Sequence, residues 1–320
     1  MKATAEKSKT QCMEISAKKR KRYGESHWSL ALMGLPGILL LFVFNYIPMG
    51  GLIIAFKDYK YNLGIFRSSW NGIKNFRIMF SSNTFFQLVR NTIGYNMTFI
   101  LLTVFVSVCV ALLLDNISSK RSIKVMQSSM FLPYFLSWIV VSYVSHACLD
   151  YNSGIINTFL SYIGKEKISF YSEPKYWPFI LVLFNTWKTV GFNSLVYYGT
   201  ILSIDTELYE AAMLDGCGYL KRVRYITIPH LRPTIITMLL LSLGSVVRSD
   251  YGLFFYLPKD TGVLYSVTDV LDTYILRTLR VAGSVGQASA AGFLQSIVGL
   301  LLVVAVNAAV RKYEEESALF

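Results

Sequence analysis

Long stretches without Asp, Glu, Lys or Arg constrain this chain more than any other feature. Four stretches carry no charge at all, and they cover residues 29–56, 91–114, 125–149 and 281–310. Two more are nearly as apolar: residues 176–202 contain only Lys188, and residues 234–257 contain only Arg248 and Asp250. A helix needs about 20 mostly apolar residues to cross a bilayer. The sequence therefore predicts an all-α integral membrane protein with six transmembrane helices. The small residues 282–284 are expected to form a loop that leads into the last helix.

The overall composition supports this class. Only 16% of the residues are charged and 53% are apolar, whereas an ordinary soluble domain has about 25% charged residues. A net charge of +12 would be typical of a nucleic-acid-binding protein if the charges lined one groove. Here they are spread over the N-terminal tail, the loops on both sides and Lys188, so no nucleic-acid partner is expected.

The distribution of basic residues predicts the orientation. The first 28 residues hold eight Lys and Arg, and such an excess marks the cytoplasmic side. With six crossings, both termini are then cytoplasmic. The apolar stretch at 29–56 is longer than the core of a cleaved signal, so it is interpreted as a retained signal anchor.

The sequence shows no motif that is typical of an enzyme. No G-x-x-x-x-G-K-[ST] pattern occurs, and the Gly164–Lys165 pair is followed by Glu166. The four Cys and three His residues are isolated and lack metal-ligand spacing. We therefore expect no catalytic residue, no metal and no cofactor in this chain, and if ATP drives its work, another subunit binds it.

One cytoplasmic segment, residues 205–233, has a distinctive pattern. Its first half is typical of a short helix, capped by Asp205 or Thr206 and interrupted at Gly216 and Gly218. A basic amphipathic piece follows, and Pro229 and Pro233 are expected to stop it. The residues alone leave two interpretations open: a helix presented to a partner protein, or an amphipathic helix on the inner leaflet with its Lys and Arg facing lipid headgroups.

The spacing within this segment resembles a known family signature. Glu210-Ala211-Ala212, Gly216, Ile226 and Ile228-Pro229 follow the EAA pattern E-A-A-x3-G-x9-I-x-L-P of binding-protein-dependent ABC importer permeases. Ile228 replaces the Leu of that pattern, and Asp215 supplies the common Asp before the glycine. Residues 90–92, 131–133, 177–193 and 295–312 also resemble the carbohydrate branch, so the resemblance covers about 30–312.

The resemblance implies a type I ABC importer permease fold in the bacterial plasma membrane. It divides the chain into a basic tail (1–28), a first helix (29–56), an outer loop (57–89), a permease core (90–312) and a C-terminal tail (313–320). Seven residues would couple the permease to an ATPase: Glu210, Ala211, Ala212, Asp215, Gly216, Ile226 and Pro229. The implied partners are a second homologous permease, two ATPase subunits that bind ATP and Mg²⁺, an extracytoplasmic solute-binding protein, membrane lipid and a carbohydrate substrate.

Polar residues within the apolar stretches are candidates for the substrate path. Lys188 lies about 16 Å along the helix from Trp177, where a lysine costs about 2.5–3.5 kcal/mol on insertion scales. A role in a cavity or path competes with a structural pairing, for instance with Asp250, and Arg248 could simply snorkel outward. The path residues predicted here are Asn185, Trp187, Lys188, Asn193, Tyr197, Arg248, Asp250 and Tyr251. Taken singly, a membrane Trp or Tyr is more often lipid-facing or core than ligand-binding.

The predicted function is therefore the permease subunit of an ATP-driven importer that forms half of the path for an oligosaccharide or polysaccharide fragment. The alternative is a secondary transporter or channel driven by an ion gradient, with Lys188 and Asp250 as the relay, although no inverted repeat is visible. A membrane-embedded enzyme is a weaker alternative because no catalytic constellation occurs.

Overall fold

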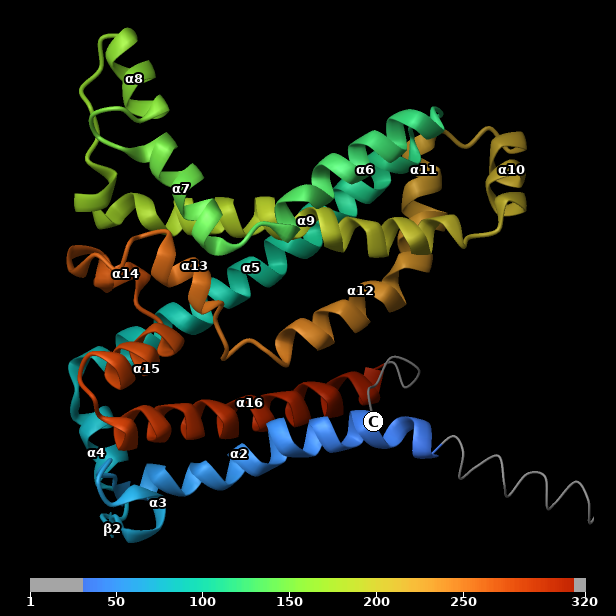
Figure 1. Cartoon of the computed structure of the whole chain (residues 1–320). Helices are drawn as coiled ribbons and strands as arrows, with labels where there is room; N and C mark the ends of the chain where they lie inside the picture. The colour runs from blue at the N-terminus through green and yellow to red at the C-terminus, as the bar shows by residue number, and fades with distance from the viewer. Residues whose placement is uncertain (1–30, 314–320) are drawn as a thin grey trace, which may run out of the picture.

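The computed structural model describes residues 31–313, which form long helices running side by side (Figure 1). The basic N-terminal tail and nearly all of the predicted C-terminal tail lie outside these residues. Five helices are long and apolar enough to cross a membrane: Ala31–Phe56, Thr84–Asp115, Pro174–Leu202, Tyr219–Leu243 and Val285–Ala308. Two shorter helices, α6 (Lys120–Phe135) and α7 (Trp138–Leu149), form a further apolar pair bent by 101°. Counting that pair as one broken crossing gives the six predicted spans.

The spanning helices vary in regularity. The first continues from residue 31 through η1 (Phe42–Tyr46), α2 (Ile47–Met49) and η2 (Gly50–Phe56). The second is α5 (Asn83–Asp115), and the fourth is α9 (Trp177–Leu202). The fifth comprises α11 (Tyr219–Arg222), η5 (Val223–Thr227) and α12 (Ile228–Leu243), and the last is α16 (Val285–Tyr313). Residues 281–284 are not helical and Gly283 has a φ of 63°, so the loop expected before the last helix is confirmed.

The third predicted span, residues 125–149, is not one continuous helix. α6 begins earlier than the apolar stretch, at the N-cap Ser119, whose side chain accepts a hydrogen bond from the Ser122 amide. Leu136 and Ser137 then have extended backbones, and the Ser137 side chain accepts from the Val140 amide to start α7. Ser137 provides a new N-cap directly after the break. The whole stretch is free of charge, so its apolar length alone did not reveal the break.

The fifth span is also displaced from the prediction of 234–257, which was wrong. Pro229 lies at the start of α12, where its missing N–H is tolerated, and the preceding turn widens so that the Ile228 amide bonds the Val223 carbonyl. Pro233 lies inside α12. The two prolines therefore do not end the segment, and residues 219–233 belong to the spanning helix and not to a loop.

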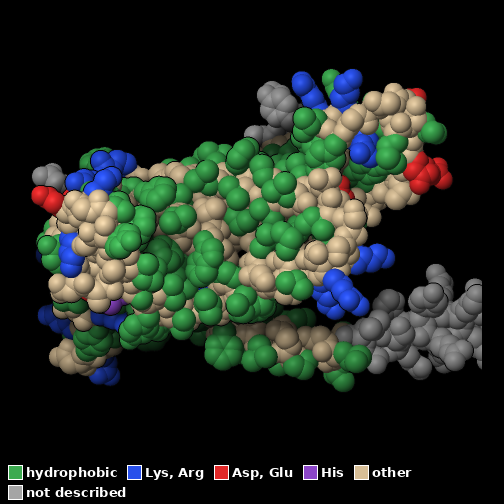
Figure 2. All heavy atoms as spheres, turned by 90° about the horizontal axis from the view of Figure 1, so that it is seen from above, with side chains coloured by type: hydrophobic (Ala, Val, Ile, Leu, Met, Phe, Trp, Pro, Cys, Tyr) green, Lys and Arg blue, Asp and Glu red, His purple; other side chains and the backbone are tan. Residues whose placement is uncertain are grey.

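The surface matches a membrane environment. On the face that Figure 2 shows, Lys, Arg, Asp and Glu gather toward the two ends, and hydrophobic side chains cover much of the surface between them. Large apolar side chains of α5 and α16, such as Leu101, Phe105 and Leu300, are exposed. Because lipid takes the place of water there, these helices do not need a polar outer face.

Helices α9 and α6 approach each other closely where they cross. A Cβ added at Gly191 would lie 1.8 Å from the Met130 carbonyl oxygen, so only glycine permits this approach. Nearer the start of α9, Trp177, Leu181, Leu253 and Val270 are buried in one apolar cluster. This cluster joins α9 to the short helices that follow α12.

The two ends of the bundle carry different elements. One end, called here the α10 end, carries α10 (Thr206–Leu214), and the described part of the chain begins and ends there (Figure 1). The opposite end, the α8 end, carries the remaining short elements. These are β1 (Lys57–Asp58), α3 (Gly64–Arg67), β2 (Ser69–Trp70), α4 (Lys74–Ser81), α8 (Ile155–Tyr162), η3 (Phe170–Ser172), η4 (Pro174–Tyr176), α13 (Tyr251–Tyr256), η6 (Gly262–Leu264), α14 (Tyr265–Thr268) and α15 (Leu271–Arg280). β1 and β2 pair antiparallel, with Lys57 opposite Trp70.

Candidate coupling helix and membrane path

The helix α10 is built by its capping residues. The Asp205 side chain accepts a hydrogen bond from the Glu207 amide at 3.0 Å, which satisfies a free donor of the first turn. At the other end, the Cys217 amide bonds the Ala212 carbonyl and the Gly216 amide bonds the Met213 carbonyl. This pair of bonds is a Schellman motif, and it requires the left-handed φ of 74° at Gly216.

The surface of α10 is open. None of its residues is buried, and its three large apolar side chains, Leu208, Met213 and Leu214, are exposed, with Leu214 at 91%. Glu210 and Ala211 are exposed as well, and Ala212 is half-buried. A short helix with an apolar and acidic surface is suited to lie in the groove of a partner protein.

The other predicted coupling residues lie nearby but on different elements. Asp215 and Gly216 form the exposed turn after α10. Ile226 is half-buried in the wide turn η5, and Pro229 is exposed near the start of α12. The pattern thus spans a helix, its cap and the base of the next spanning helix.

The predicted path residues on α9 do not form one site. Trp187 lines an apolar cavity of about 420 Å³ together with Pro133, Met130 and Thr186. Asn193 donates to the Thr189 carbonyl of its own helix at 2.9 Å. Asn185 is buried, and Tyr197 is fully buried with a hydroxyl that has no hydrogen-bond partner within residues 31–313.

Lys188 lies at the break between α6 and α7. Its ammonium donates to the carbonyl oxygens at the end of α6: Tyr134 at 3.1 Å, Pro133 at 3.5 Å and, at shorter range, Leu136. The last carbonyls of a helix lack amide donors from a following turn, and the C-terminal end of a helix attracts a cation. Of the three, the Pro133 carbonyl also accepts a hydrogen bond from the Leu136 amide. Lys188 therefore completes the hydrogen bonding of a helix that ends inside the bundle.

Arg248, Asp250 and Tyr251 lie beyond the fifth span and not within it. Arg248 is exposed in a non-helical segment, so it does not share a helix face with Tyr251. Asp250 is the N-cap of α13: its carboxylate accepts from the Gly252 amide at 2.9 Å and from the Trp138 indole. No ion pair joins Lys188 to Asp250 among the described side chains. Tyr251 stacks on Phe255 at 4.9 Å.

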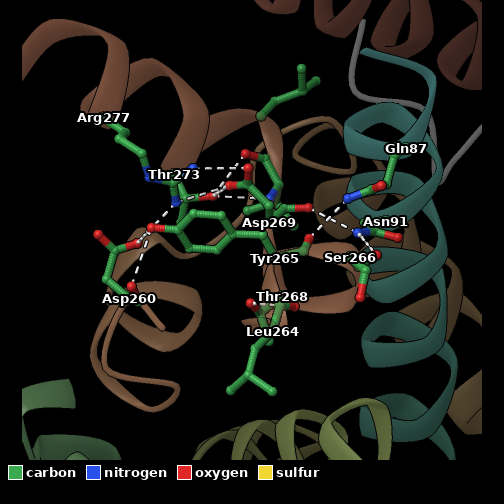
Figure 3. A network of polar contacts seen from close by, with 12 residues as sticks. Gln87, Asn91, Asp260, Leu264, Tyr265, Ser266, Thr268, Asp269, Thr273 and Arg277 are labelled. Carbon is green, nitrogen blue, oxygen red and sulfur yellow. Dashed lines mark hydrogen bonds and ion pairs between the residues drawn. The ribbon is translucent and has the colours of Figure 1, made fainter. Parts of the chain in front are cut away.

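A polar stripe on α5 supports the segment between α12 and α15. Gln87 donates to the Tyr265 carbonyl at 2.9 Å, and Asn91 donates to the Ser266 and Asp269 carbonyls (Figure 3). Tyr95 continues the stripe with a 2.8 Å bond to the Val267 carbonyl. Irregular backbone near a membrane is tolerated where protein satisfies its polar groups. The spacing of four residues, from 87 to 91 to 95, is the sequence signal that could have revealed this stripe.

An ion-pair network holds the same segment at the α8 end. Arg277 bonds Asp269 and Asp260, each at 2.9 Å, and lies 3.8 Å from the centre of the Tyr265 ring (Figure 3). Burial acts to lower the pKa of Arg277, but its hydrogen bonds to Asp269 and Asp260 and their charges outweigh burial and raise it. The guanidinium therefore stays charged at any physiological pH. The network fixes Asp260 at a φ of 46°, which is uncommon for a residue other than glycine.

Comparison with known proteins assigns this arrangement to a class. Residues 124–249 match the family described as binding-protein-dependent transport system inner membrane component. The chain is 32% identical over 287 residues to the polygalacturonan/rhamnogalacturonan transport system permease protein YteP of Bacillus subtilis strain 168, covering 90% of this chain and 89% of that protein. It is 31% identical to the protein LplB of the same strain, covering 90% of each.

Solved structures give the same result. The chain superposes with a TM-score of 0.82 and 30% identity on a bacterial ABC transporter involved in the import of the acidic polysaccharide alginate, covering 91% of this chain and 97% of that one. A second structure, of a bacterial alginate ABC transporter in complex with an alginate pentasaccharide-bound periplasmic protein, gives 0.81 at 30% identity, covering 90% and 96%. The chain belongs to the family of binding-protein-dependent inner-membrane transport components, and is a multi-pass ABC transporter permease of the bacterial membrane.

Proposed function

We propose that this permease is one of two related membrane subunits of an ATP-driven importer, and that it forms half of the path for an oligosaccharide or polysaccharide fragment. The single observation that carries the proposal is the capped, exposed helix α10 between two spanning helices, within a family fold shared with an alginate importer. The names of the relatives support a glycan substrate: polygalacturonan/rhamnogalacturonan, alginate and arabinooligosaccharides.

The proposed coupling runs through α10. Two ATPase subunits would bind ATP and Mg²⁺, and one of them would seat α10 in a surface groove. Leu208, Met213 and Leu214 supply apolar contact, and Glu210 and Asp215 supply charges for basic partners. Closure of the ATPases would then move α10 and swing the spanning helices as rigid bodies.

The proposed orientation places the α10 end and both termini in the cytoplasm. The eight Lys and Arg residues of the N-terminal tail support it. The α8 end, with its short helices, would then meet an extracytoplasmic solute-binding protein that delivers the glycan. One solved relative is a complex of an alginate ABC transporter with an alginate pentasaccharide-bound periplasmic protein, which supports such a partner.

The proposed path uses two groups of polar residues. Asn185, Trp187, Lys188, Asn193 and Tyr197 lie along α9, and Arg248, Asp250 and Tyr251 follow the fifth span. Aromatic faces with amide and hydroxyl groups suit sugar rings. Lys188 and Asp250 have other contacts already, so we expect Trp187, which is partly exposed on a cavity, to contribute most directly.

Uptake by the assembled transporter tests the proposal. The permease is reconstituted in vesicles with its second permease, ATPases and binding protein, and uptake of acidic and neutral oligosaccharides is compared. The proposal predicts uptake that requires ATP and the binding protein. Uptake that needs only a proton or sodium gradient would support the secondary-transporter alternative with Lys188 and Asp250.

A further inference from the structure

Helix α10 has few ties to the rest of the molecule. It has no buried residue, and its two chain connections are the turn at 203–205 and the turn at 215–218. A helix held only by two turns could shift without moving the bundle. A coupling helix therefore needs a side-chain contact that transmits its displacement to a spanning helix.

Tyr209 makes such a contact. Its hydroxyl lies 2.9 Å from the Thr227 hydroxyl, across 18 residues of sequence. Thr227 is only 1% exposed and ends the wide turn η5, directly before α12. Because the threonine is shielded from water, its hydrogen bond is not readily exchanged for one to solvent.

A second tyrosine continues the connection. Tyr219, at the start of α11, donates from its hydroxyl to the Leu112 carbonyl at 2.8 Å, near the end of α5. The start of the fifth span, directly after the turn at 215–218, is therefore joined to α5, while α10 itself is joined to the residue that precedes α12. The helices that carry the two tyrosines, α10 and α11, both lie at the α10 end (Figure 1).

We infer that Tyr209 is the positioning residue that transmits the movement of α10 to the fifth span, through its hydroxyl bond to Thr227. This inference rests on the proposed function, since it assumes that α10 meets an ATPase. Tyr209 does not touch substrate or nucleotide in this account. Its role is to make α10 and α12 move together, so that ATP hydrolysis and glycan movement stay coupled.

The test compares Tyr209→Phe with Tyr225→Phe in the reconstituted transporter. Tyr225 is the control, because it lies in the same segment (residues 205–233) but is 69% exposed. The readout is glycan uptake per ATP hydrolysed, with complex assembly checked by size-exclusion chromatography. We expect Tyr209→Phe to assemble normally and to lower uptake per ATP about 2- to 10-fold, the factor that corresponds to one neutral hydrogen bond. Tyr225→Phe should keep the normal ratio.

Substitutions at Thr227 separate coupling from folding. Thr227→Ser keeps the hydroxyl and should keep the ratio, whereas Thr227→Val should lower it as Tyr209→Phe does. The combination of Tyr209→Phe with Thr227→Val should be no worse than either alone. An unchanged ratio in Tyr209→Phe, or an equal loss in Tyr225→Phe, would overturn the inference.

A reference variant lacking residues 210–216 distinguishes this inference from the proposed function. If that deletion abolishes stimulated ATP hydrolysis while Tyr209→Phe leaves the ratio unchanged, α10 is the coupling element and Tyr209 is not its transmitter. If the deletion has no effect, the proposed coupling itself is wrong.

Discussion

The ammonium of Lys188 lies 5.1 Å from the centre of the Trp138 ring, and the indole of Trp138 donates to Asp250. The indole thus lies between a cation and an anion, at the corner where α6 ends and α7 begins. A cation above an aromatic ring is stabilised by about 0.5–2 kcal/mol. The positive charge of Lys188, which is costly within a spanning helix, is thereby compensated by contacts within the described part of the chain.

Replacing Lys188 tests this structural role. Lys188→Met removes the ammonium that donates to the carbonyls of Tyr134 and Leu136, which we expect to cost about 1–3 kcal/mol. Thermal unfolding of the purified complex should show a lower Tm, and Lys188→Arg should restore part of it because a guanidinium also donates. An unchanged Tm together with lost glycan uptake would assign Lys188 to the substrate path instead.

Gly216 and Gly218 provide a test position and a matched control for the C-terminal cap of α10. Neither has an atom within 4 Å of an added Cβ, but Gly216 has a φ of 74° and Gly218 a φ of −66°. An L-residue in the left-handed region costs about 1–2 kcal/mol. Gly216→Ala should therefore lower stimulated ATP hydrolysis several-fold, and Gly218→Ala should leave it near normal. Equal losses would show that the φ at Gly216 is not the cause.

The close approach of α9 to α6 depends on Gly191. Its added Cβ would meet the Met130 carbonyl at 1.8 Å, whereas one at Gly199, on the same helix, would meet nothing within 4 Å. Overpacking of this kind costs about 1–3 kcal/mol or more. Gly191→Ala should reduce the yield and Tm of the complex, and Gly199→Ala should not. A normal Tm for both variants would mean that α9 and α6 can move apart without loss of stability.

Arg277 should be important for stability at the α8 end. Arg277→Met leaves Asp269, which is 6% exposed, as an unpaired buried charge, and breaking such a pair costs about 3–5 kcal/mol. We expect a marked fall in Tm, measured by scanning fluorimetry of the complex. Arg280→Met, at an exposed position on the same helix α15, is the control, and a similar fall in both would contradict the role of the network.

The sequence allowed the spanning helices and α10 to be predicted because those signals are local. Charge-free length indicates a span, and the spacing from Glu210 to Gly216 indicates a capped helix. The break at Leu136 was not predictable in this way, since Pro133 lies inside α6 and the donor for the free carbonyls, Lys188, is more than 50 residues away.

The fifth span illustrates the same limit. Pro229 and Pro233 are typical helix breakers, yet Pro229 lies at the start of α12, directly after the wide turn η5, and Pro233 lies inside α12. The spacing of residues 87, 91 and 95 marks a polar stripe on α5, but its partners were not predictable, because they are carbonyls of residues 265–269, which are far away in the sequence. Contacts of this kind depend on the tertiary structure and not on local pattern.

ATP hydrolysis by the complete transporter tests the central claim most directly. The rate is measured with and without glycan-loaded binding protein, for the normal permease and for a variant lacking residues 210–216, after membrane insertion of both is verified. The account predicts that the normal complex is stimulated and that the deletion abolishes the stimulation while the variant still inserts. Full stimulation of the deletion variant would contradict the role of α10 as the element that couples this permease to its ATPase.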